Sequence, residues 1–194
     1  MSIVSKRLIS YLIDIFIIFL VLIIIKGVLP VNIHEIELNN LNELYIENKI
    51  DFNLYFDQFI SITHNIDKSN ISFNLFGCLL IIIFCIVIPF LNKGQTLGQK
   101  ICKLKISKKD LTIKDLSGRA TILYGLGYLF FMFLILFLTT NKIYFILINL
   151  LGIFQISVVI INGFMVLYKK EGIADKLTKT RIEEIKWENL QNKN

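Results

Sequence analysis

Two residue types that rarely enter hydrocarbon lie at the start of this chain. Arg7 precedes an apolar run, residues 8–25, in which fifteen of eighteen residues are Leu, Ile, Val or Phe and Asp14 is the only charge. A desolvated carboxylate is suited to exchanging a proton or holding a cation, which is the functional interpretation of Asp14. The structural alternative is a buried polar contact that fixes helix packing. Arg7 has a structural alternative too, as an anchor at the membrane boundary.

The partner of Arg7 is the next question. In a helix, Arg7 and Asp14 lie two turns apart on one face, about 10 Å along the axis, which is near the limit of a direct pair. Asp175 lies eight residues past Leu167, at the end of the last apolar run. We therefore expect Asp175 to fold back to the membrane edge and pair with Arg7, the alternative being a solvated acid in the tail.

Polar residues in the later apolar runs could extend this site. Asn149, Gln155 and Asn162 fall on one side of a helical wheel, together with Gly152. Depth counting places Cys85, Tyr124 or Tyr128, and Asn162 near the level of Asp14. Amides in a membrane need a protein or water partner. They would form either a polar path lined with Asp14 or hydrogen bonds that hold helices together.

The elements that position these residues are four apolar segments. They cover 8–29, 73–91, 120–138 and 143–167, and each is long enough to span a bilayer. With 55% hydrophobic residues, 19% charged residues and a mean hydropathy of +0.65, the chain does not resemble a soluble domain. The sequence predicts a single all-α membrane domain, 1–194, folded as a four-helix bundle in the lipid bilayer.

Charge in the connecting segments predicts the topology. The 31–70 loop has seven acids and two bases, the 92–119 loop has eight bases and two acids, and the 168–194 tail has seven bases. Basic segments stay in the cytoplasm. We therefore expect a multi-pass plasma-membrane protein with both termini cytoplasmic. The net charge of +6 follows from these loops and gives no reason to expect nucleic-acid binding.

The outer loop 31–70 has a pattern of its own. Leu54, Tyr55, Phe59 and Ile62 recur at helical spacing and predict an amphipathic helix. His34 and His64 are expected to be solvated, because no partner ligands stand at metal-site spacing. The three cysteines likewise form no metal or disulfide pattern. No catalytic residue, metal site or cofactor is predicted, and we expect no enzyme activity.

The segment after the second apolar run, Gly94 to Lys100, resembles a phosphate-binding loop only superficially. Its glycines are four residues apart rather than five, and Gln99 stands where the lysine is needed. A flexible turn followed by a basic strand over 101–106 fits the residues better.

Taken together, these motifs resemble the RDD family of bacterial membrane proteins, which is named for one arginine and two aspartates. The segments that carry the resemblance are Arg7–Asp14, the loop Gly94–Ile106 with Thr96, Gly98 and Lys100, the helix-opening Arg119, and Ala174–Thr180. The naming residues correspond to Arg7, Asp14 and Asp175. Gln99 replaces a lysine and Ala174 a common histidine, so a role for that histidine does not carry over.

The resemblance implies a membrane protein, and cation/proton antiport has been ascribed to some members of the family. Our leading hypothesis is proton-coupled transport of a small cation, with self-association into a homo-oligomer completing the pathway, because four helices are few for a carrier. The alternative is a non-transporting accessory or scaffold protein that binds a partner through its outer loop or basic face. Transport requires a polar path, whereas a scaffold would have a dry core with Asp14 locked in place.

Overall fold

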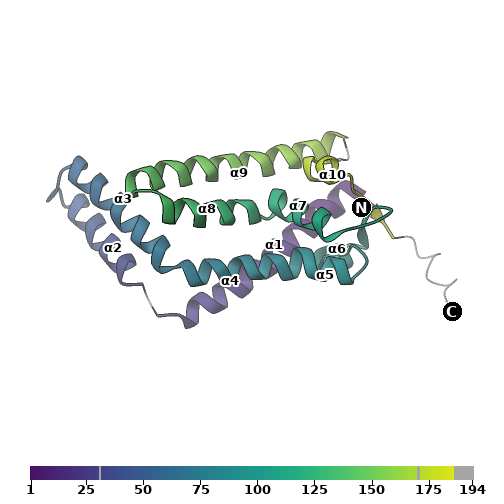
Figure 1. Ribbon diagram of the computed structural model, residues 1–194, viewed down its shortest axis with the longest axis horizontal. Helices are drawn as coiled ribbons and strands as arrows, with labels where there is room; N and C mark the ends of the chain where they lie inside the picture. Colours follow the sequence, from purple (N-terminus) through teal and green to yellow (C-terminus); the bar gives the residue numbers. More distant parts are fainter. Residues whose placement is uncertain (31, 170, 186–194) are drawn as a thin grey trace.

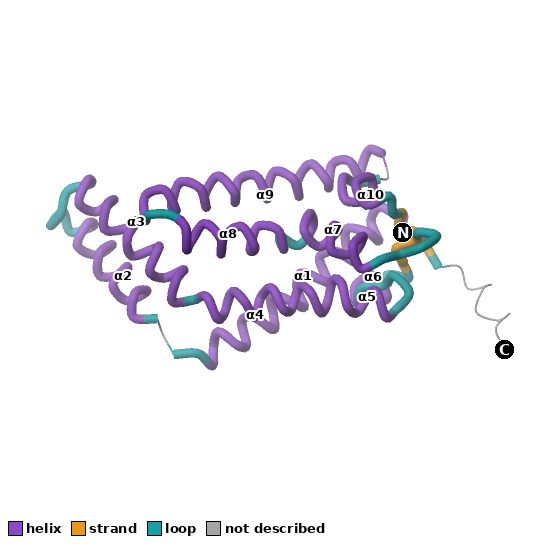
Figure 2. The backbone as a smooth tube through the Cα atoms, in the orientation of Figure 1, coloured by secondary structure: helices purple, strands orange, loops and turns teal. Residues whose placement is uncertain are grey.

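The computed structural model describes residues 1–30, 32–169 and 171–185, and helices make up most of it (Figure 2). The elements in chain order are α1 (Ile3–Val28), α2 (Ile33–Ile46), α3 (Phe52–Ser69), α4 (Ile71–Ile82), the π-helix η1 (Ile83–Val87), α5 (Ile88–Leu91), α6 (Leu97–Ile101), β1 (Leu104–Ser107), α7 (Ile113–Leu123), α8 (Leu126–Leu138), α9 (Asn141–Lys169), α10 (Ile173–Thr178) and β2 (Arg181–Glu184). The all-α prediction is confirmed. Of the predicted tail 168–194, residues 170 and 186–194 lie outside the described part.

Three helical segments are long and apolar enough to cross a membrane: α1, the continuous run α4–η1–α5 and α9. The predicted third span, 120–138, is instead two helices, α7 and α8, that meet at an angle of 74°. Gly125 makes this break, with a left-handed φ of 72° that costs glycine little. The first span also begins earlier than predicted, so Arg7 lies inside α1.

The break between α7 and α8 leaves backbone carbonyls without helical partners, which is costly in hydrocarbon. Two side chains from other helices supply donors. The Tyr11 hydroxyl donates to the Leu123 carbonyl at 2.7 Å, and the Gln155 amide donates to the Ile122 carbonyl at 3.0 Å. The broken span is therefore held from both sides, by α1 and by α9.

Residues 32–70 of the predicted outer loop fold as two helices at the end of the molecule away from the N-terminus (Figure 1). The predicted amphipathic helix is confirmed as α3, which begins where the Asp51 side chain accepts the Leu54 N–H at 2.8 Å. α3 packs on α9 as well as on α2. The prediction that His64 is solvated is wrong, because this packing buries its ring against Tyr144, with ring centroids 5.0 Å apart.

His34 is only partly exposed and bonds to Glu37 at 2.7 Å. Near His64, the Tyr144 hydroxyl donates to Asp67 at 2.7 Å. Burial raises the pKa of Asp67 above its ordinary value, and the hydrogen bond from Tyr144 offsets only part of that rise. The nitrogen Nε2 of His64 is buried and has no hydrogen-bond partner in the described part of the chain.

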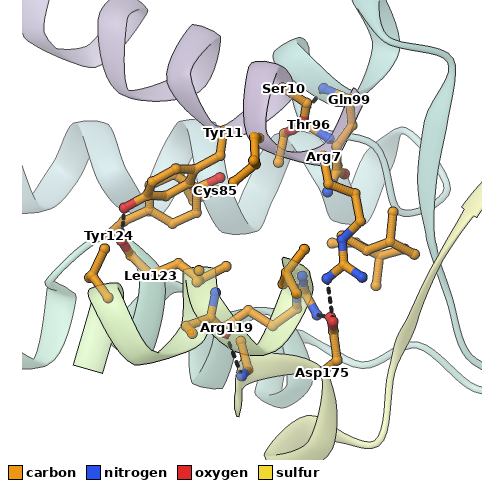
Figure 3. Close-up of a pocket in the computed structure, with 18 of the residues that line it drawn as sticks. Arg7, Ser10, Tyr11, Cys85, Thr96, Gln99, Arg119, Leu123, Tyr124 and Asp175 are labelled. Atoms are coloured by element: carbon orange, nitrogen blue, oxygen red, sulfur yellow. Dashed lines mark hydrogen bonds and ion pairs between the residues drawn. The ribbon is translucent and has the colours of Figure 1, made fainter. Parts of the chain in front are cut away.

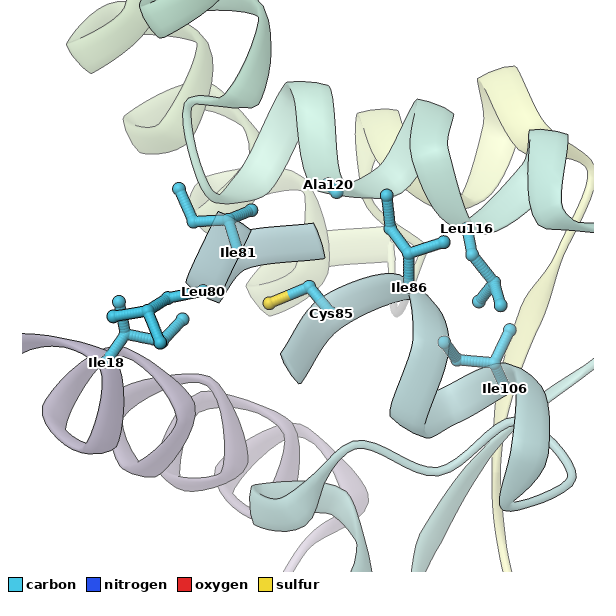
Figure 4. Packing of buried hydrophobic residues seen from close by; sticks show 8 residues of the cluster. All are labelled: Ile18, Leu80, Ile81, Cys85, Ile86, Ile106, Leu116 and Ala120. Carbon is cyan, nitrogen blue, oxygen red and sulfur yellow. The ribbon is translucent and has the colours of Figure 1, made fainter. Parts of the chain in front are cut away.

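The buried apolar cluster lies toward the end that holds the N-terminus. It joins side chains of α1, α4, η1, β1 and α7: Ile18, Leu80, Ile81, Cys85, Ile86, Ile106, Leu116 and Ala120 (Figure 4). Elsewhere the long helices expose their apolar side chains, and only 11% of the most apolar window of α9 is buried. Such faces suit a lipid surround.

A two-stranded antiparallel sheet closes this end of the bundle. β1 pairs with β2 in a register that sets Ile106 opposite Ile182. The predicted strand 101–106 is shifted along the chain, because α6 continues to Ile101 and β1 begins at Leu104. Lys6 of α1 forms an ion pair with Glu184 of β2. The N-terminal helix and the last described strand are therefore joined directly.

Candidate functional site

Asp14 is buried, and its carboxylate accepts three hydrogen bonds. Its Oδ2 accepts from the Thr96 hydroxyl at 2.6 Å and from the Tyr124 hydroxyl at 3.1 Å, and its Oδ1 accepts from the Gly98 N–H at 2.8 Å. These donors come from the loop before α6, from α6 itself and from the break after α7. A carboxylate surrounded by converging donors is held in its place, as the packing interpretation of Asp14 requires.

The loop 94–100 is built to meet this carboxylate. The Thr96 hydroxyl accepts the Gln99 N–H, and the Gln99 side chain accepts the Thr96 N–H, which together make a capping box at the start of α6. A Cβ added to Gly98 would lie 2.1 Å from the Ser10 carbonyl oxygen, so α6 can approach α1 only with glycine there. The predicted flexible turn is wrong: α6 is docked on α1.

The other members of this motif lie around the docked helix. Gly94 has a φ of 89°, and a Cβ there would lie 2.3 Å from the Ile106 carbonyl oxygen. Its N–H donates to the Pro89 carbonyl at 2.7 Å. Lys100, by contrast, is exposed. The motif thus combines backbone positions that tolerate only glycine with a surface lysine.

Asp175 lies at the centre of a second buried cluster (Figure 3). Arg7 donates to its Oδ2 and Arg119 to its Oδ1, the latter at 2.5 Å. The Gly172 N–H also donates to Oδ2 at 2.9 Å, and Arg119 donates to the Thr180 hydroxyl at 2.7 Å. The predicted pair of Arg7 with Asp175 is confirmed, and Arg119 is a second partner that we did not predict for Asp175.

The charges around Asp175 decide its protonation. Burial raises the pKa of this carboxyl, but the positive charges of Arg119 and Arg7 and the hydrogen bonds from Arg119 and the Gly172 N–H together outweigh burial, so the pKa lies below its usual range. Asp175 is therefore ionised at neutral pH. It acts as a fixed counterion between two guanidinium groups that together carry one more charge than it can balance.

The predicted polar path is not continuous among the described residues. Asn149 is exposed and donates to the Phe145 carbonyl of its own helix at 2.7 Å. The Gln155 amide donates to the Ile122 carbonyl at the break between α7 and α8, and the Asn162 side chain accepts the Ala174 N–H at 3.2 Å. These amides therefore satisfy backbone groups on separate elements.

Of the two tyrosines considered at the depth of Asp14, only Tyr124 bonds to it. Tyr128 lies instead beside Gly152, where an added Cβ would be 3.8 Å from its ring. The capping box was visible in the sequence as Thr96-Leu97-Gly98-Gln99, a pattern that predicts a helix start. No comparable sequence signal pointed to Tyr124 over Tyr128.

A cavity of about 350 Å³ connects the two clusters. Arg7, Arg119 and Asp175 line one end, and Tyr11, Leu123 and Tyr124 lie toward the other (Figure 3). Among residues 1–30, 32–169 and 171–185, no three His, Cys, Asp or Glu side chains gather as metal ligands would. The donors at the charged end are suited to an acceptor or an anion.

Comparison with known proteins gives one match. A sequence model described as the RDD family matches residues 2–179, a range that includes Asp14, Asp175 and the residues described above that donate hydrogen bonds to them. Comparison with curated proteins and with solved structures found no match.

Proposed function

We propose, from the premise that this chain belongs to the RDD family, that it is an integral membrane protein that carries no solute and acts as an accessory or scaffold. The observation that carries this proposal is the state of Asp14, whose carboxylate receives three hydrogen bonds from other segments. A coupling site must release and rebind its ion. Freeing Asp14 here would require α6 to leave α1.

The topology belongs to the same proposal. The span α1, the run α4–η1–α5, the broken pair α7–α8 and α9 form four membrane passes, with both termini cytoplasmic in the plasma membrane. The charge difference between the 31–70 and 92–119 segments supports this orientation. In addition, α1 and β2 meet at one end of the bundle. The basic end then faces the cytoplasm.

The basic end, formed by residues 92–119, has the charge of a surface that binds an acidic partner. Residues 92–119 hold eight bases against two acids, and Lys100, Lys109 and Lys114 are exposed. The β1–β2 pairing and the docking of α6 hold this surface in a defined shape. We propose that it binds an acidic face of a partner protein.

Proton-coupled transport of a small cation by a homo-oligomer is the second candidate. Its support is the presence of two buried carboxylates, Asp14 and Asp175, close to the cavity. Against it, the second of these is already neutralised by arginines. The two candidates therefore differ in whether an ion moves.

Reconstitution in liposomes decides between them. Purified protein is tested for Na⁺, K⁺ and proton flux under several pH gradients, with protein-free liposomes as the baseline and an ionophore as the positive control. The accessory function predicts no flux above the baseline. Flux that depends on pH and disappears in Asp14→Asn would establish transport and end this proposal.

A separate experiment tests the working surface. A photo-crosslinking residue is placed at Lys109 on the basic end, and the matched control is placed at the exposed Asn48 between α2 and α3. Crosslinking in cells should give a discrete protein adduct at position 109 and none at position 48. Equal adducts at both positions would refute a partner surface at the basic end.

A further inference from the structure

The cavity beside Arg119 continues along α1. A second cavity of about 310 Å³ shares four lining residues with the first: Tyr11, Leu123, Tyr124 and Val159. It extends to Ile18, Phe19 and Leu22. The two cavities form one slot, with α1 on one side and the α7–α8 break and α9 on the other. α1 packs mainly on α6 and α4, and its contact with α9 is slight.

The slot has the length of a lipid tail. Its lining runs along α1 from Arg7 to Leu22, which is about 22 Å at the helical rise. An acyl chain of a lipid crosses half of the bilayer core, about 15 Å, and therefore fits within this length. Beyond the tyrosines the lining is apolar apart from Gln155, whose amide nitrogen is already bonded to the Ile122 carbonyl. A hydrocarbon chain can therefore lie in this part without leaving a polar group unpaired.

The other end of the slot offers donors in excess. The Arg119 side chain is 5% exposed, and only its Nη1 has acceptors among the described residues. Its Nε and Nη2 are further donors. The amide nitrogen of Asn162 also has no acceptor in the described part of the chain, and both residues line the cavity. These donors belong to residues that line the cavity, so this end suits a group with several oxygens.

The charges in the lining favour an anion as the ligand of this slot. Three charged side chains line the slot: Arg7, Arg119 and Asp175. Two are positive and one is negative, so the lining carries a net charge of one positive unit. Asp14 does not line the slot, since the hydroxyls of Thr96 and Tyr124 lie between and donate to it. A cation would meet two guanidinium groups here. A negative phosphate would neutralise the excess.

We propose that this slot binds one anionic phospholipid, with the phosphate at Arg119 and one acyl chain lying along α1 toward Leu22. A helix of a second copy does not fit, since a helix with side chains is about 10 Å across and the cavities hold only about 350 and 310 Å³. A free phosphate would leave the apolar part empty. The site does not depend on whether the protein transports an ion.

The test uses the full-length protein after delipidation in detergent. Native mass spectrometry follows the titration of dioleoylphosphatidylglycerol, with dioleoylphosphatidylcholine as the zwitterionic lipid of equal chains and inorganic phosphate as a headgroup alone. Val159→Trp fills the shared wall of the slot. Ile160→Trp is the matched control, because Ile160 is exposed on the outer side of the same helix.

The proposal expects a one-to-one adduct with phosphatidylglycerol, about tenfold tighter or more than with phosphatidylcholine, and no competition by inorganic phosphate. Val159→Trp should lose the adduct and Ile160→Trp should keep it. Equal binding of the two lipids by the unchanged protein overturns the proposal without reference to any variant. A lipid adduct that survives in Val159→Trp also overturns the proposal. Occupation of the slot only by a second copy of the protein does the same. Flux results in liposomes leave all of these outcomes unchanged.

Discussion

Gly98→Ala is the sharpest test of the way α6 docks on α1. The added Cβ would lie 2.1 Å from the Ser10 carbonyl oxygen and 3.0 Å from Asp14 Oδ1. Neither atom can easily turn aside, because the first is backbone and the second belongs to a carboxylate whose other oxygen, Oδ2, accepts hydrogen bonds from Thr96 and Tyr124. The helix must therefore move outward, and its hydrogen bonds to Asp14 lengthen or break.

The cost can be worked out from these contacts. Overpacking of a tight site costs about 1–3 kcal/mol, and a hydrogen bond to a charged group contributes about 1.5–3 kcal/mol. Alanine returns up to about 1 kcal/mol of helix propensity. If only the hydrogen bond from the Gly98 N–H is lost, these three terms together lower the free energy of unfolding by about 2–5 kcal/mol. At about 2–4 °C per kcal/mol for a chain of this size, Tm should fall by about 4–20 °C.

Two measurements check this result. Thermal unfolding in detergent gives Tm, and thiol labelling of Cys85 reports opening of the core, because Cys85 is only 4% exposed. Cys78 and Cys102 are first replaced by serine. Gly27→Ala is the control, since a Cβ at Gly27 has nothing within 4 Å. If Gly98→Ala matches Gly27→Ala in Tm and keeps Cys85 protected, the docking argument is refuted.

Four further outcomes are expected. In a cysteine-free background, an impermeant reagent added outside cells should modify a cysteine at Asn48 and spare one at Ser107; the reverse pattern would invert the topology. Asp14→Asn should be tolerated in a thermal unfolding assay, because an amide can still accept one of the hydrogen bonds, whereas Asp14→Leu should fail to fold or assemble. The folded pKa of Asp175 lies below its unfolded value of about 3.9, so its contribution is full above that pH and is lost as the pH falls through the folded value. Asp175→Asn should therefore lower Tm at pH 7 and remove the corresponding loss of Tm in acid; an unchanged acid limb would show that another group causes it. His64→Phe should leave Tm unchanged or raise it, because it removes a buried nitrogen without a partner, and a fall of several degrees would mean that the ring has a polar role.

The sequence was sufficient for features that depend on composition along one segment. Apolar length predicted the three helical segments that are long enough to cross a membrane, and the isolated acid near a helix-end arginine predicted the pairing of Asp175 with Arg7. The break at Gly125 was not predicted, because residues 120–138 form one apolar run in the sequence, and the bend is evident only from the left-handed φ in the structure. The sequence of such a run does not show which backbone carbonyls accept hydrogen bonds from side chains of other helices.

The errors concern side chains whose roles depend on distant elements. Gln155 and Asn162 read as a path because they share a helix face, but each bonds a backbone group of a different element. His64 was expected to be solvated because no partner ligands stand at metal-site spacing in the sequence, although Tyr144 of α9 packs against its ring. Counting depth placed Tyr124 and Tyr128 as equals, and the turn after α7 decided between them. Such partners are fixed by tertiary contacts that periodicity along one helix does not encode.

The long sequence separation between Asp14 and its hydrogen-bond donors has a consequence for the synthesis of the chain. Gly98 lies 84 residues after Asp14, and Asp175 lies 168 residues after Arg7. At a synthesis rate of about 5–20 residues per second, the carboxylate waits roughly 4–17 s for its first donors. Arg7 waits about twice as long for its counterion Asp175. Until then, α1 carries an unpaired acid into the translocation machinery, so a chain stalled before α6 presents a defect that membrane quality control can recognise.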